Sequence, residues 1–103
     1  MPRPQKDRII KQPPAFSSFK PTGVMRKGLE RIVLSLDEYE AIRLADYRQL
    51  EHADAAKEME ISRSTFTRLL ERARAKSAAL FVEGKELVIE GGNIHFRRNR
   101  LQC

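Results

Sequence analysis

The sequence has almost no cysteine, no tryptophan and no long apolar run, and each shortage excludes a class of protein. The one cysteine is the last of 103 residues, Cys103, so an internal disulfide is excluded. The two histidines, His52 and His95, lie too far apart to form a standard zinc site with it. No stretch approaches the roughly 20 apolar residues of a membrane helix, and residues 1–11 lack the apolar core of a secretory signal. We therefore expect a cytoplasmic protein without metal, cofactor or membrane association.

Catalytic patterns are equally scarce. No nucleophile–base pair, glycine-rich phosphate loop or metal-ligand set is visible in the sequence, so we do not expect an enzyme. The aromatic residues are only five phenylalanines and two tyrosines. These are few for a surface that stacks RNA bases, so RNA binding is the third choice among the functions considered.

Charge, by contrast, is plentiful and unevenly distributed. The net charge is +6, and residues 1–36 carry a balance of +6, residues 37–60 of −5 and residues 61–85 of +4. Basic surfaces attract polyanions such as nucleic acids. A solvated surface without a partner has the same composition, so charge alone does not distinguish the two.

We divide the chain into three parts. Residues 1–30 form a basic, proline-rich segment, residues 31–93 a helix-turn-helix domain with a C-terminal strand, and residues 94–103 a basic tail, of which residues 97–103 are expected to be loose. Four of the five prolines lie within the first 14 residues, where they remove backbone donors and disfavour helix.

Three helices are expected in the central part. Ser35 and Glu38 have the spacing of a capping box, which predicts a helix running to about Arg48. A shorter helix fits residues 52–59. Its predicted apolar side consists of Ala53, Ala56 and Met59.

The third helix has the strongest periodicity. Ser62 is suited to cap it and Gly84 to end it. Its apolar positions fall within one arc of roughly 120° and are expected to be buried. They are Phe66, Leu69, Leu70, Ala73, Ser77, Leu80 and Phe81.

The strand signals are weaker than the helix signals. Residues 86–90 are predicted to form a strand, with residues 8–11 or 32–34 as candidate partners. Phe16 and Phe19 are candidates for docking on the core. The expected fold is mainly α, of the α+β class, with a three-helix core containing a helix-turn-helix and a small β element from the N-terminal segment and residues 86–90.

The second and third helices and the short connection between them have the pattern of a helix-turn-helix. The small Ala56 permits a close helix crossing. The turn often carries glycine where this chain has Glu60, and a positive φ there costs a non-glycine residue roughly 1 kcal/mol. The residues expected to set the crossing angle are Met59, Ile61, Phe66 and Leu69.

The outward face of the third helix supplies the candidate DNA contacts. The residues assigned to base edges are Arg63, Ser64, Thr67 and Arg68. An arginine that forks onto guanine is worth about 1–3 kcal/mol of discrimination. The residues assigned to phosphates are Ser62, Arg72, Arg74, Lys76, Arg3, Lys6 and Arg8.

Each of these assignments has a plainer alternative. Glu71 lies three residues from both Arg68 and Arg74 and can pair with either on the helix surface. A solvated face explains Arg74 and Lys76 as well as phosphate contact does. The N-terminal cations form either an arm on the DNA or a disordered tail, and His52 is taken as an ordinary exposed histidine.

Four blocks of the sequence also resemble a known family. They are FKPTG at residues 19–23, VLSLDEYEAIRLAD at 33–46, ISRSTF at 61–66 and IEGGN at 89–93. In this order and spacing they are similar to the small prokaryotic family called domain of unknown function 134, a set of predicted DNA-binding proteins. The resemblance implies a helix-turn-helix like that of the fourth region of sigma factors.

The chain departs from that family in two respects. Many members carry cysteines in the basic N-terminal segment, where this chain has Asp7-Arg8-Ile9-Ile10, so a metal or redox role does not carry over. Some members are fused to a domain like those of nitrogenase cofactor-handling proteins. The 103 residues contain no such domain, so a ligand-sensing function is not borrowed either.

The function expected from these features is sequence-specific binding of double-stranded DNA in transcriptional regulation. A single helix-turn-helix module buries only about 600–1,000 Å² of surface on DNA. We therefore expect a homodimer that reads two half-sites roughly 34 Å apart, with residues 86–96 or the first helix as the interface. The alternative is a protein–protein adaptor whose acidic block, residues 37–60, recruits a basic partner.

Overall fold

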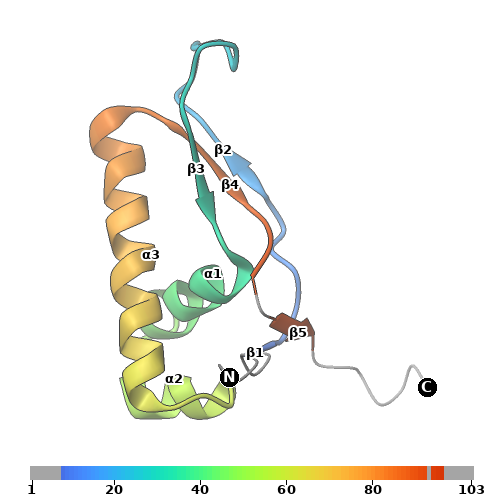
Figure 1. Ribbon diagram of the computed structural model, residues 1–103, viewed down its shortest axis with the longest axis vertical. Helices are drawn as coiled ribbons and strands as arrows, with labels where there is room; N and C mark the ends of the chain where they lie inside the picture. Colours follow the sequence, from blue (N-terminus) through green and yellow to red (C-terminus); the bar gives the residue numbers. More distant parts are fainter. Residues whose placement is uncertain (1–7, 93, 97–103) are drawn as a thin grey trace, which may run out of the picture.

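The computed structural model describes residues 8–92 and 94–96 of the chain, and Figure 1 gives its element labels. The elements in this part are β1 (Arg8–Ile10), β2 (Ser18–Phe19), β3 (Arg31–Leu34), α1 (Leu36–Ile42), the π-helical η1 (Arg43–Tyr47), α2 (His52–Glu58), α3 (Arg63–Glu83), β4 (Glu86–Ile89) and β5 (Ile94–Phe96). The predicted α+β fold, with three helices and a small β element, is confirmed.

The main sheet has three strands in the order β2–β4–β3. The central strand β4 is parallel to β3, with Leu87 opposite Ile32, and antiparallel to β2, with Leu87 opposite Phe19. Of the two candidate partners of the 86–90 strand, residues 32–34 are therefore the one that pairs with it. The N-terminal segment joins this sheet through β2, whose two residues give no strand signal in the sequence.

A second, two-stranded sheet was not expected. Strand β1 pairs in parallel with β5, formed by residues 94–96, rather than with β4. The cause is the turn at Gly91 and Gly92, whose φ angles of 76° and 103° direct the chain away from the main sheet. Gly92 also passes so close to Asp37 that an added Cβ would lie 2.7 Å from its Oδ1 atom. Residues 97–103, which are expected to be loose, lie outside the described residues.

The helix ends follow local sequence rules. The capping box at the start of α1 is present, since Glu38 N–H donates to Ser35 Oγ and Ser35 N–H donates to Glu38 Oε1 at 3.0 Å. The helix continues through η1, where Arg48 N–H donates to the carbonyl oxygen of Arg43 at 2.9 Å. Ser62 caps α3 and Gly84 ends it with a φ of 66°. The predicted helix limits are therefore confirmed to within a residue or two.

Two groups of apolar side chains hold the elements together. The larger joins α1, α2 and α3, and the smaller joins α3 to the sheet. The first consists of Ala41, Leu44, Ala45, Ala55, Ala56, Met59, Phe66, Leu69 and Leu70. The second consists of Leu34, Ala73, Leu87 and Ile89.

Three burial predictions are wrong. Ala53 is exposed and Ala55 is buried in its place. The side chain of Phe81 is 79% exposed, and Phe16 and Phe19 also remain exposed. Phe81 is exposed because α3 runs along the sheet beyond the part of the core that α1 and α2 fill, so its last turns have few partners (Figure 1).

Candidate nucleic-acid interface

The connection between α2 and α3 consists of four residues, Met59 to Ser62. Glu60 has a φ of 56°, which confirms the positive value expected where glycine is common. Its N–H donates to the Lys57 carbonyl at 3.1 Å, and the N–H of Ile61 donates to the Ala56 carbonyl at 3.0 Å. These bonds satisfy backbone groups at the end of α2 and turn the chain sharply into α3.

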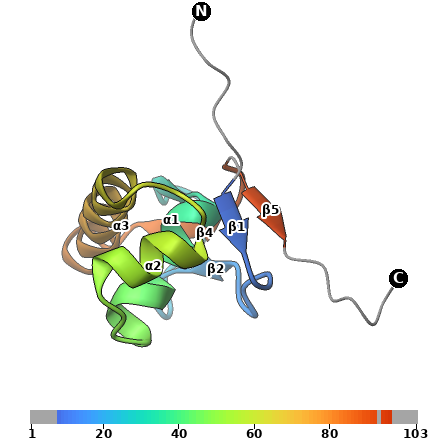
Figure 2. The same cartoon turned by 90° about the horizontal axis from the view of Figure 1, so that it is seen from below.

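Small and apolar side chains set the crossing of α2 over α3. Ala55 and Ala56 are buried, which lets the helix backbones approach closely. Met59 and Phe66 are fully buried at the crossing, and Ile61 packs against them half-buried. The residues predicted to set this angle therefore share one cluster, and Figure 2 shows α2 in front of the other helices.

The N-terminal turns of α3 point polar side chains outward. Ser62 Oγ accepts from Thr65 N–H at 3.1 Å and lies 3.2 Å from Ser64 Oγ. Arg63, Ser64 and Arg68 are exposed, whereas Thr67 is half-buried. Three of the four residues assigned to base edges are therefore open to solvent, and the fourth lies at the edge of this face.

His52 is a contributor that sequence reasoning missed. It is half-buried rather than an ordinary exposed histidine, with Nδ1 3.3 Å from Thr67 Oγ1 and its ring edge-on to Phe66 at 5.5 Å. His52, the first residue of α2, therefore contacts Thr67 at the edge of the outward face of α3. Only the folded helix pair brings residues 52 and 67 together, so no spacing rule reveals the contact.

Arg63 and Arg68 carry the free positive charge of this face. In the part of the chain that the structure describes, neither guanidinium has an ion pair or a hydrogen bond. The ion pairs predicted between Glu71 and Arg68 or Arg74 are likewise not formed among these residues. Two guanidinium groups, each with unused donors in a fixed fork, are therefore available to a partner with acceptor atoms.

The basic residues farther along α3 are paired with acids. Glu38, almost fully buried, lies 3.3 Å from Arg72 Nε and accepts from Lys76 Nζ at 2.7 Å. Lys76 also donates to the Val33 carbonyl at 2.8 Å. Burial opposes ionisation of Glu38, but the hydrogen bonds from Lys76 and Ser35 outweigh it, so the pKa of this carboxyl lies below its ordinary value.

Arg74 is paired as well. Its guanidinium forks onto Asp46, at 2.6 Å and 3.1 Å, and the hydrogen bond lowers the pKa of Asp46. Both side chains are partly exposed, so the pair stabilises the fold by at most about 1 kcal/mol. The three cations assigned to phosphates on this helix thus connect α3 to α1, η1 and β3.

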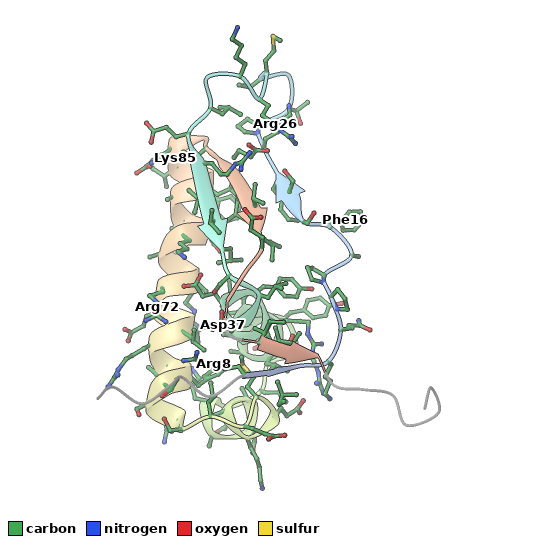
Figure 3. All side chains as sticks on the ribbon, turned by 45° about the vertical axis from the view of Figure 1, so that its right-hand side comes forward. Arg8, Phe16, Arg26, Asp37, Arg72 and Lys85 are labelled. Atoms are coloured by element: carbon green, nitrogen blue, oxygen red, sulfur yellow. The ribbon has the colours of Figure 1, made fainter. Side chains whose placement is uncertain are left out.

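The N-terminal residues assigned to phosphates are Arg3, Lys6 and Arg8, and the structure describes only the last of them. Arg3 and Lys6 lie outside the described residues. Arg8 opens β1 with its side chain 11% exposed and Nη1 3.8 Å from Asp37 Oδ2. Figure 3 labels both residues. Ile9 N–H donates to the Met59 carbonyl at 3.1 Å, so the described chain begins beside the α2–α3 connection.

The acidic block at residues 37–60 is only partly an open surface, since Glu51, Asp54 and Glu60 are exposed but other acids of the block are not. Asp37, Glu38 and Glu40 are buried, and Glu40 accepts two hydrogen bonds from Arg43, at 2.7 Å and 2.9 Å. Glu58 pairs with Lys11 at 2.9 Å, and its pKa is lowered mainly by that hydrogen bond. Much of the negative charge expected to recruit a basic partner is therefore used inside the fold.

No described helix is both long and apolar enough to cross a membrane. Across residues 8–92 and 94–96, no three His, Cys, Asp or Glu side chains come together in a way that would hold a metal ion. The chemistry this face offers is that of cations and hydroxyl groups.

Comparisons with known proteins agree with the sequence blocks described above. The model of the family described as "Protein of unknown function DUF134" matches residues 1–97. A UPF0251 protein of Chloroherpeton thalassium is 60% identical over 103 residues, all of this chain and 68% of the relative. A UPF0251 protein of Pelotomaculum thermopropionicum is 45% identical over the whole chain, which covers 78% of it.

Coverage of the relatives varies. A UPF0251 protein of Chlorobaculum tepidum is 49% identical over 94 residues, 91% of this chain, and the chain spans about half, 48%, of that relative. No solved structure matches the chain. The family match, which extends over nearly every residue, and the identity of these relatives establish that the chain belongs to the DUF134 family.

Proposed function

We propose that α2, the four-residue connection and α3 form a helix-turn-helix that binds double-stranded DNA sequence-specifically, as a transcriptional regulator and not as an enzyme. The observation that carries this proposal is the exposure of Arg63 and Arg68, unpaired in the described chain, on the first turns of a helix whose other side is buried. The N-terminal turns of a recognition helix are the part that reaches base edges.

The side chains on this face suit major-groove readout. Arg63 and Thr67, and likewise Ser64 and Arg68, are four residues apart and therefore neighbours on the helix surface. Each arginine presents the fork that matches guanine O6 and N7. The hydroxyl groups donate or accept, and His52 holds Thr67 in place from α2.

The phosphate contacts are fewer than composition suggests. Arg72 and Lys76 are held by a buried carboxylate, and Arg74 must release Asp46 before it can reach a phosphate. Ser62 and the first amides of α3 suit a phosphate at the positive end of the helix dipole. We therefore expect few released counterions for each copy, and a salt dependence that is measurable but shallow.

The test begins with selection of bound sequences from a random duplex pool. Binding of the selected duplex and of a random duplex is then measured by fluorescence anisotropy at several salt concentrations. Arg63→Ala and Arg68→Ala should weaken the selected duplex by about 5- to 150-fold and the random duplex much less.

Lys27→Ala is the matched control, since Lys27 is exposed in the loop between β2 and β3, at the end of the molecule away from α2 (Figure 1). It removes one positive charge and should leave both affinities nearly unchanged. The proposal is wrong if duplex binding does not saturate, or if all three variants bind both duplexes alike.

A protein–protein adaptor remains the second candidate, because the last turns of α3 expose apolar side chains. Phe81 and Val82 are 79% and 84% exposed. An adaptor without DNA readout would show no saturable, salt-dependent binding to any duplex, so the same anisotropy series separates the two functions.

A further inference from the structure

The C-terminal half of α3 borders an apolar groove. A hollow of about 300 Å³ lies between this half of α3, the sheet and α1. Its walls include Leu80 and Phe81 of α3, Leu87 and Ile89 of β4, Tyr39 of α1 and Phe19 of β2. A second hollow continues from it past Leu80 and Phe81 toward Gly84, so the groove reaches the end of the helix.

The rim of the groove is large, apolar and open. Phe81 on one wall is 79% exposed and Phe19 on the opposite wall is 45% exposed. Val82, which follows Phe81 in the chain but does not line the groove, is 84% exposed. Single exposed apolar residues are ordinary on protein surfaces, but adjoining ones around a hollow mark an interaction site. The exposed apolar side chains around the groove therefore suggest a binding partner, since no other part of the described chain buries them.

Few charged side chains line the groove. Lys20 is the one charged residue that lines the groove, and its Nζ donates to the Val24 carbonyl at 2.6 Å. Beyond the helix end, Lys85 lies 2.7 Å from Glu83 and 3.2 Å from Glu30. Arg26 and Arg31 also lie at this end, 2.9 Å and 3.7 Å from Glu86, so the region as a whole keeps a small positive charge. The groove itself, however, is lined by apolar and neutral residues apart from Lys20.

We propose that this groove is the interface between two copies of the chain, related by a two-fold axis that passes near Phe81. Two copies of a strongly basic protein repel each other through most of their surfaces, and the apolar groove, with one charged residue in its described lining, is where that repulsion is small. A two-fold interface brings the same patch of each copy together, and a mainly apolar patch around Phe81 can pack against its own copy. Duplex DNA is a poor occupant, because the groove offers it almost no cations.

The position of the groove also suits the proposed DNA binding, on which this part of the inference rests. At a rise of about 1.5 Å per residue, Phe81 lies about 26 Å along α3 from Ser64. Two α3 helices that diverge from the groove by roughly 80° place their first turns about 34 Å apart, the spacing of successive major grooves on one side of a duplex. In such a dimer, the faces of the two α3 helices that carry Arg63, Ser64 and Arg68 remain open to DNA.

Sedimentation velocity over a range of protein concentrations, without DNA, tests the interface directly. The wild-type chain should dimerise, and Phe81→Lys should weaken the dimer about 30-fold or more, as expected for a central apolar contact. Val82→Lys, beside Phe81 at the exposed end of α3, and Phe19→Lys on the opposite wall are further variants in case the first disturbs the fold, which circular dichroism reports. Tyr47→Lys is the control, because Tyr47 is 81% exposed but lies in η1, outside the groove.

The outcomes separate this proposal from the proposed function. A wild-type chain that stays monomeric, or a dimer unaffected by Phe81→Lys and Val82→Lys, overturns the interface, including the case in which the extra length of the relatives covers the groove instead. A monomeric wild-type chain that still binds duplex saturably leaves DNA binding standing without this interface. A dimer sensitive to Phe81→Lys that binds no duplex supports the interface and contradicts DNA binding.

Discussion

The two halves of α3 differ in what each leaves exposed. In residues 63–71 the apolar side chains are buried and the arginines at 63 and 68 have no partner within the described chain. In residues 72–83 the relation is reversed, because Arg72, Arg74 and Lys76 are paired with acids while Phe81 and Val82 are open to solvent. One continuous helix thus presents a charged face suited to a polyanion at one end and an apolar face suited to a protein at the other.

The largest expected difference between the halves is in stability. Phe66 is fully buried where α2 crosses α3, so Phe66→Ala should lower the free energy of unfolding by about 3–5 kcal/mol. Phe81→Ala, at a 79% exposed position of the same helix, should change it by less than about 0.5 kcal/mol. Urea denaturation at concentrations too low for self-association measures both, and equal effects would contradict the assigned packing.

The next effect concerns binding rather than folding. Arg63→Ala should cost about 1–3 kcal/mol of affinity for the selected duplex, because a bidentate contact to a base is lost. Arg72→Ala should cost less, since its guanidinium lies against Glu38. Anisotropy titrations of both variants measure the difference. A larger loss of affinity for Arg72→Ala would show that the base contacts lie in the second half of α3 and not in the first.

A smaller effect on stability is expected at Glu38, the α1 carboxylate that pairs with Arg72 and Lys76 in the second half of α3. Glu38→Gln should destabilise the fold by about 1–2 kcal/mol at neutral pH, because a buried charge that pairs with two cations is replaced by a neutral acceptor. Because the amide can still complete the capping box, the loss should come mainly from Arg72 and Lys76.

The pH dependence of Glu38→Gln checks the cause. The pKa of Glu38 in the folded protein lies below its ordinary value of 4.5, so its contribution is complete above that value and is lost as the pH falls through the folded pKa. Unfolding measured from about pH 6 to pH 3 should therefore show the wild type and the variant converging in acid. A constant difference over this range would assign the effect to packing instead.

The smallest effect is expected for Arg74. Its pair with Asp46 is partly exposed, so Arg74→Ala should reduce stability by at most about 1 kcal/mol. Its affinity for selected and random duplexes should fall slightly and equally, since a phosphate contact carries no sequence information. Thermal unfolding and the same anisotropy assay measure these effects, and a loss confined to the selected duplex would make Arg74 a reader of bases.

Local signals in the sequence were sufficient for the helices and their ends. Ser35, Ser62 and Gly84 act through neighbouring backbone groups, so the spacing of a few residues predicts them. The same holds for Glu60, whose positive φ follows from its place in the turn. The outward positions of Arg63, Ser64 and Arg68 follow from helical periodicity once Phe66 is placed inside.

Contacts between distant segments were beyond these rules. The pairing of β1 with β5 joins residues more than 80 positions apart, and β2 is too short to have a pattern of its own. The partners of Arg72, Arg74 and Lys76 lie on α1, η1 and β3, and not one turn away on α3 where helix spacing places Glu71. The spacing of residues along one helix predicts ion pairs within that helix only, and not pairs with residues of other elements.

The sequence by itself determined the three helices, their caps, the sharp turn before α3 and the charge of its outward face, because each depends on residues only a few positions apart. The tertiary structure alone decided which cations remain free and which apolar residues remain exposed. Both depend on where α1 and the sheet end along α3: carboxylates of α1 and η1 reach its second half, and no described element covers Phe81 and Val82.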